Sequence, residues 1–118
     1  MVPLNGVFME AYLYLLMAIA GEVVGTSALK ASYGMTKLFP SLVVVVGYGL
    51  TFWSLSIALK TLPVGVVYAI WSGLGIVSII LIGVYFFNEA FSLMHLLGTA
   101  LILAGVAVLM LFTGPVSE

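Results

Sequence analysis

A single acidic residue, Glu22, lies inside the first long apolar segment of the chain. It is the only charged residue between Ala11 and Leu29, in the stretch AYLYLLMAIAGEVVGTSAL. A carboxylate at the centre of a membrane-spanning helix costs roughly 2.5–3.5 kcal/mol on insertion scales. Acids that are nevertheless found there face other helices or a cavity, where they take part in ion and substrate paths. We therefore interpret Glu22 as a functional residue whose natural partner is a proton or a cation.

The residues on the helix face of Glu22 are small or weakly polar. At helical spacing, Ala18, Ile19, Gly25 and Thr26 share its side. Ala18 and Gly25 leave room for a ligand or a neighbouring helix beside the carboxylate. The alternative is a packing seam alone, of the small-xxx-small kind. An acid in its midst favours the binding site, because a packing seam needs no acid.

Aromatic residues of the third apolar segment are suited to an organic cation. Tyr68, Trp71, Ser72 and Gly75 fall at i, i+3, i+4 and i+7, which is one helix face. The face of a Tyr or Trp ring attracts a cation by ~0.5–2 kcal/mol. The alternative is an aromatic belt at the membrane surface, but Trp71 lies about seven residues inside the segment. Gly73 and Gly75 would allow a bend or a close neighbour, so they are a candidate hinge.

The second apolar segment offers Tyr48 and Thr51 on one face, and Trp53 on another. On a regular helix Trp53 lies ~140° from Tyr48. Both line one site only if it forms between several helices or two chains; otherwise Trp53 packs against lipid or another helix. In the fourth segment, Gly98 and Gly105 predict a dimer contact, because small residues let helices approach closely in lipid. The alternative for them is packing within one chain.

The composition points to lipid as the solvent of this chain. Of its 118 residues, 64% are hydrophobic and 6% are charged, whereas soluble domains carry about 25% charged residues. The absence of Cys excludes disulfides and thiolate metal sites. A net charge of −1 with no basic cluster argues against nucleic acid as a partner. There is no nucleophile–base pair, metal cluster or phosphate loop, so neither an enzyme nor a cofactor is predicted.

Turn residues and charges divide the chain into four apolar spans. They cover about 11–30, 41–59, 64–87 and 93–112, and each is close to the ~20 residues that cross ~30 Å of hydrocarbon. Backbone groups in lipid must be satisfied within the segment, so the spans are predicted to be helices. The fold class is an all-α membrane protein, with residues 1–118 as one four-helix transmembrane domain. Glu10, Glu89 and Glu118 lie at span ends or in the tail and are interpreted as solvated charges.

The chain is short for a transporter. Four helices form a small bundle with little room for a substrate path, and the sequence has no internal repeat. Many transporters combine two halves of opposite topology, so here a second chain would supply the second half. Lys30 and Lys37 against Lys60 give a weak charge bias. Either the first loop is cytoplasmic or both orientations are inserted.

Three strings carry a resemblance to a known family. GEVVGTSALKASYGMTKLFPS, YGLTFWSL and LPVGVVYAIWSGLGIV resemble the small multidrug resistance family in order and spacing, over about Tyr12–Phe112. The resemblance implies an antiparallel, dual-topology homodimer in the bacterial cytoplasmic membrane, which exports lipophilic cations in exchange for protons. It implies that Glu22 of both subunits binds protons and cations in competition. The residues that it implies around the site are Ala18, Ile19, Gly25, Thr26, Tyr48, Trp53, Tyr68 and Trp71, with the hinge at Gly73 and Gly75 and the dimer contact at Gly98 and Gly105.

The subtype is also indicated by this resemblance. Gly25, Thr26, Tyr48 and Trp53 are similar to the quaternary-ammonium branch, whereas guanidinium exporters have Trp at position 25 and lack Tyr at position 48. Tyr33 departs from the family, which often has an acid there. Two rival functions are a guanidinium or polyamine exporter and a small structural or regulatory membrane protein. A pore is disfavoured, because a single buried acid provides too few polar groups for a water-filled path.

Overall fold

The structure is a computed structural model that describes residues 6–112. It contains four helices: α1 (Gly6–Ala31), α2 (Leu38–Ala58), α3 (Val64–Phe86) and α4 (Leu93–Phe112). Each is long and apolar enough to cross a membrane. The prediction of an all-α protein with four membrane-spanning helices is therefore confirmed, while the antiparallel homodimer stays a prediction. Glu118 lies outside the described residues.

Two helices begin earlier than the predicted spans. α1 starts at Gly6 rather than near Ala11, and α2 starts at Leu38, after Lys37 in an extended conformation. Pro40, which lies directly before the predicted span 41–59, occupies the first turn of α2. Backbone N–H groups in a first turn have no helical partner, so a proline costs no hydrogen bond there. Pro40 is therefore a residue of the first helical turn and does not belong to the preceding loop.

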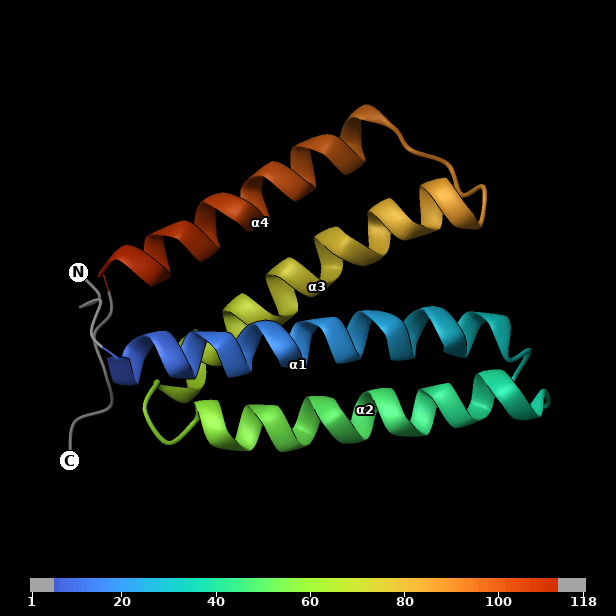
Figure 1. The fold of residues 1–118 in the computed structure, drawn as a ribbon. Helices are drawn as coiled ribbons and strands as arrows, with labels where there is room; N and C mark the ends of the chain where they lie inside the picture. Colours follow the sequence, from blue (N-terminus) through green and yellow to red (C-terminus); the bar gives the residue numbers. More distant parts are fainter. Residues whose placement is uncertain (1–5, 113–118) are drawn as a thin grey trace.

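The helices form an open layer in the order α2, α1, α3, α4 (Figure 1). α1 packs along α2, while α3 diverges from α1 towards its C-terminal end and has α4 at its other side. Within α4, Val106 is the one buried residue. Among residues 6–112, α4 packs chiefly against α3 and leaves most of its apolar surface uncovered in a single chain.

Glycines bring the backbones of α1 and α2 into direct contact. A Cβ added to Gly21 would lie 2.8 Å from the carbonyl oxygen of Gly47, and a Cβ on Gly47 would lie 2.8 Å from that of Gly21. The buried Thr51 donates its hydroxyl to the Ala18 carbonyl oxygen at 2.9 Å. Gly25 lies against the Tyr48 ring. The packing seam considered as an alternative is thus present, but it faces α2, whereas Glu22 faces α3.

An ion pair joins the end of α1 to the loop that follows α3. Lys30 Nζ lies 2.7 Å from Glu89 Oε2. The Glu89 carboxylate occupies the space that a side chain at Gly83 would need, and the Gly83 carbonyl accepts the backbone N–H groups of Phe87 and Glu89. Glu89 is exposed, as predicted for a solvated charge, and it also pairs with Lys30, because the chain reverses at a left-handed Asn88 and returns Glu89 towards α1.

Candidate functional site

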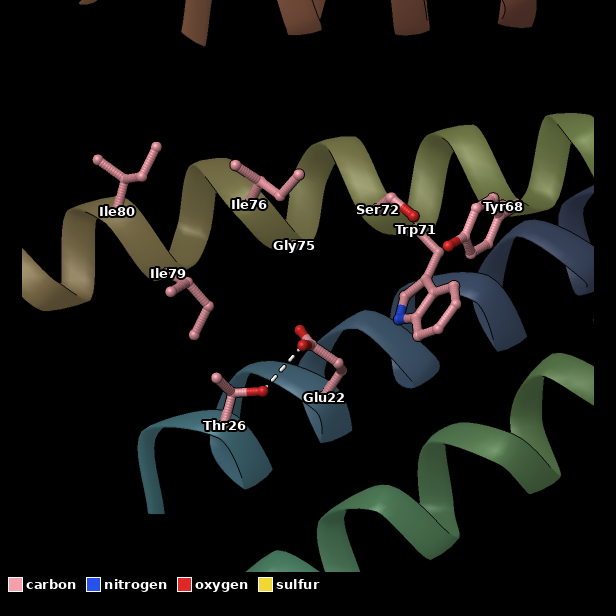
Figure 2. Close-up of a pocket in the computed structure, with 9 residues that line it drawn as sticks. All are labelled: Glu22, Thr26, Tyr68, Trp71, Ser72, Gly75, Ile76, Ile79 and Ile80. Atoms are coloured by element: carbon pink, nitrogen blue, oxygen red, sulfur yellow. Dashed lines mark hydrogen bonds between the residues drawn. The ribbon is translucent and has the colours of Figure 1, made fainter. Parts of the chain in front are cut away.

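A cleft of about 360 Å³ lies where α1 meets α3 (Figure 2). Glu22 and Thr26 project into it from α1, and Trp71 and Ile79 project towards α1 from α3. Its volume is in the range of small-molecule sites, which is roughly 300–1,000 Å³. The complete lining is Glu22, Thr26, Tyr68, Trp71, Ser72, Gly75, Ile76, Ile79 and Ile80.

The two oxygens of the Glu22 carboxylate have different surroundings. Oε1 accepts a hydrogen bond from Thr26 Oγ1 at 2.8 Å, and Thr26 Oγ1 lies 2.5 Å from Tyr48 OH. Because a threonine hydroxyl has one proton, Tyr48 must donate to Thr26 when Thr26 donates to Glu22. Oε2 is buried and has no hydrogen-bond partner among residues 6–112. The cleft is therefore lined by a carboxylate with one oxygen oriented by Thr26 and the other buried without a partner.

Gly75 allows α3 to come close to this carboxylate. A Cβ at Gly75 would lie 3.2 Å from Glu22 Oε2, with no other atoms between them. Gly73, two residues earlier, faces α4, where an added Cβ would lie 2.5 Å from Val106 Cγ2. Both glycines are thus close-contact positions on opposite sides of α3. The helix continues through them without interruption, and their role as a hinge stays a prediction.

Two aromatic rings, Tyr68 and Trp71, border the cleft, and a third packs against one of them. The Tyr68 and Trp71 ring centroids are 5.5 Å apart, and Phe52 of α2 meets Trp71 edge to face at 6.4 Å. Tyr68 is 63% exposed, so in a single chain its ring face is open to a ligand. Phe52 was not predicted. Phe52 directly follows Thr51 and lies on the α2 face next to Tyr48, and this helical spacing could have predicted its place near the site.

The structure brings together some of the predicted site residues and separates others. Glu22, Thr26, Tyr68 and Trp71 line the cleft, Tyr48 joins it through Thr26, and Gly25 supports the Tyr48 ring. Ala18 and Ile19 lie in the hydrophobic core instead. Trp53 is 55% exposed and packs edge to face on Tyr14, 5.8 Å away. A single chain therefore provides no shared site for Tyr48 and Trp53.

The isoleucines of the lining were missed by sequence reasoning. Ile79 lies four residues after Gly75 and so extends the helix face that begins at Tyr68. This helical spacing could have predicted Ile79. Two further clefts, of about 390 and 490 Å³, have no ionisable side chain among their described lining residues. Over residues 6–112, no three His, Cys, Asp or Glu side chains gather as metal ligands. Unlike these two clefts, the one at Glu22 combines an acid with aromatic rings.

Comparison with known proteins identifies the family of the chain. The chain matches the family described as Small Multidrug Resistance protein over residues 10–102. The quaternary ammonium compound-resistance proteins QacF of Klebsiella aerogenes and QacE of Escherichia coli are each 50% identical to it over 105 residues, which is 89% of this chain and 96% of theirs. The multidrug transporter PA4990 of Pseudomonas aeruginosa is 52% identical, with the same coverage. With its four membrane-length helices, the chain is a multi-pass protein of the bacterial cytoplasmic membrane and belongs to the small multidrug resistance family of transporters.

Proposed function

We propose that the protein exports quaternary ammonium and other lipophilic cations in exchange for protons, with Glu22 as the shared binding group. The observation that carries this proposal is the buried, unpartnered Oε2 of Glu22 in a cleft walled by Tyr68 and Trp71. A buried polar atom without a partner is costly. A cation or a proton at this oxygen removes that cost, and the rings suit the apolar surface of an organic cation.

Competition for the carboxylate couples the two fluxes. Ionised Glu22 attracts an organic cation, which stacks against Trp71 and Tyr68. Protonation neutralises the carboxylate, so the attraction is lost and the cation leaves. If protons and cation never occupy the site together, a proton gradient directed into the cell drives the cation outward. This requires a site that opens to one side of the membrane at a time.

A second copy of the chain, inserted in the opposite direction, completes the transporter in this proposal. The open layer of helices supports it, because α4 has an uncovered apolar surface and one buried residue. A Cβ at Gly98 or Gly105 would meet no atom within 4 Å, so neither glycine is closely packed against residues 6–112 of its own chain. The fourth-helix glycines are therefore free to contact the partner, and the partner brings a second Glu22 and the exposed Trp53 within reach of the site.

Substrate class is tested by transport into liposomes with the purified protein alone. The names of the relatives QacF and QacE support quaternary ammonium compounds, as does Tyr48 beside Gly25. A panel of guanidinium, spermidine and tetraphenylphosphonium, each with an imposed proton gradient, separates the subtypes. We expect proton-driven transport of tetraphenylphosphonium. Transport of guanidinium alone would overturn the assignment to the quaternary-ammonium branch, and transport of no cation would favour a structural role.

Replacing Trp71 with Ala is expected to weaken binding of tetraphenylphosphonium about tenfold. The change removes a ring face worth ~0.5–2 kcal/mol or more when desolvated, and it leaves Glu22 in place. Isothermal titration in detergent measures the affinity. The matched control is Tyr85→Ala, which removes an exposed ring elsewhere on α3 and should leave the affinity unchanged. Equal affinities for the two variants would remove Trp71 from the site.

Replacing Tyr48 with Phe is expected to weaken the same binding about two- to tenfold. Phe retains the ring that packs on Gly25 and loses the hydroxyl that contacts Thr26, and one hydrogen bond contributes ~0.5–1.5 kcal/mol net. Tyr33→Phe, at an exposed position in the first loop, is the control. A normal affinity in Tyr48→Phe, measured by the same titration, would show that the Thr26 hydroxyl orients Glu22 without help from Tyr48.

A further inference from the structure

The groove that contains Glu22 continues along α1 to the end of the helix. Glu22, Thr26 and Lys30 follow one another at every fourth residue, so they form one face of α1. A second cleft, of about 90 Å³, lies between Thr26, Lys30, Ile79, Gly83, Phe87 and Glu89. It shares Thr26 and Ile79 with the cleft at Glu22. The two clefts are therefore successive parts of one groove between α1 and α3, and Glu22 and Lys30 lie ~12 Å apart along the α1 axis.

The outer end of this groove already holds an ammonium group. Lys30 Nζ lies 2.7 Å from Glu89 Oε2 and 5.4 Å from the centroid of the Phe87 ring. A carboxylate and an aromatic face thus surround one cation, within the ~6 Å over which a ring attracts it. The same two kinds of group, Glu22 and Trp71, line the inner cleft. The ammonium of Lys30 occupies the position that the head of an organic cation would take.

The ion pair is easily exchanged. The side chains of Lys30 and Glu89 are 55% and 49% exposed, and ion pairs in contact with water contribute little net stability because solvent screens them. A strong latch would need a buried, dry pair. The backbone of Glu89 is held independently of Lys30, since its N–H donates to the Gly83 carbonyl oxygen at 3.0 Å, and its carboxylate lies against Gly83. The acceptor therefore stays in position when the lysine side chain swings away.

We propose that Glu89 and Phe87 form an outer binding site for organic cations, which Lys30 occupies in its resting state and yields to a substrate on its way to or from Glu22. This inference rests on the proposed function. It assigns to Phe87 and Glu89 the role of a first contact at the end of the groove. Displacement of Lys30 by a second cation enlarges the small outer cleft and opens it towards Thr26 and the inner site.

Binding kinetics distinguish an outer site from a latch. A transient site on the path speeds association and dissociation by the same factor, so the dissociation constant at Glu22 is unchanged. We expect Glu89→Gln to slow both rates of tetraphenylphosphonium about threefold or more at low salt, where surface charges act most strongly. Lys30→Gln removes the competing ammonium and should speed both rates by a similar factor. Stopped-flow tryptophan fluorescence of the purified full-length protein measures them.

Matched variants separate the site from a general effect of charge. Glu10→Gln makes the same charge change near the other end of the layer, and Lys37→Gln makes the same change as Lys30→Gln on an exposed neighbour. Phe87→Leu removes a ring without any change of charge and should slow both rates about twofold, whereas Phe86→Leu, at an exposed position, should not. If Glu89→Gln does not fold, the comparison of Phe87→Leu with Phe86→Leu decides the question, because breaking a barrier would also speed both rates in Lys30→Gln.

The possible failures have different signatures. Rates in Glu89→Gln that equal those of Glu10→Gln overturn the outer site. Rates that exceed the wild-type rates overturn it as well, because they would mean that the ion pair between Lys30 and Glu89 blocks the path of the cation. Rates in Lys30→Gln that do not exceed those of Lys37→Gln overturn it as well. Failure of the proposed function is recognised separately, because the wild-type protein would then bind tetraphenylphosphonium no better than Glu22→Gln does.

Discussion

Glu22→Gln is expected to abolish proton-coupled export and to weaken cation binding by about a hundredfold or more. Gln has nearly the same shape as Glu and keeps the oxygen that accepts from Thr26, but it lacks the charge. At ~4 Å and an effective dielectric constant of ~20, a charge pair contributes ~4 kcal/mol before the cost of desolvation is subtracted. The variant also has no group that exchanges a proton, so a pH gradient can no longer drive transport.

The measurement compares uptake of tetraphenylphosphonium into inverted vesicles under an imposed proton gradient. Glu10→Gln is the matched control, because it makes the same change at an exposed position of α1 and should transport normally. Circular dichroism and the amount of protein in the membrane check that the Glu22→Gln variant is inserted and helical. Proton-driven uptake by that variant would sink the assignment of Glu22 as the shared site.

The sequence indicated the part of the site that lies on single helices. Helical spacing placed Tyr68, Trp71, Ser72 and Gly75 on one face of the third span, and all four line the cleft. The free-energy cost of a charged side chain in lipid identified Glu22 as a candidate functional residue. These inferences succeed because helical periodicity and the cost of burial act within a segment. They need no knowledge of which helices are neighbours.

The contacts between helices were beyond this reasoning. The hydrogen bond between Thr26 and Tyr48 depends on the register of α1 against α2, which Gly21 and Gly47 set by their close approach. Lys30 and Glu89 are 59 residues apart in the chain, and because α3 diverges from α1, only the turn at Asn88 returns Glu89 to Lys30. The spacing of Ala18 and Ile19 suggested the site, yet α2 and α3 cover them.

Gly47→Ala is expected to destabilise the protein by about 1–3 kcal/mol, the usual cost of forcing extra volume into a packed interior. The added methyl group would lie 2.8 Å from the Gly21 carbonyl oxygen and 3.0 Å from the Gly25 Cα. Both neighbours are backbone atoms, so no side-chain rotation relieves the clash, and α1 and α2 must move apart. Separation would also strain the bond from Thr51 to Ala18, one turn before Glu22.

Gly49→Ala is the matched control, since it adds the same methyl group to the same helix where nothing lies within 4 Å. Ala is favoured over Gly in a helix by roughly 0.5–1 kcal/mol, so this variant should be as stable as the parent or slightly more so. Thermal unfolding in detergent, followed by circular dichroism, compares the two. Because the seam holds α1 in register, Gly47→Ala should also weaken cation binding although residue 47 is outside the cleft. Equal stability of the two variants would mean that α1 and α2 approach less closely than the Gly21–Gly47 contact requires.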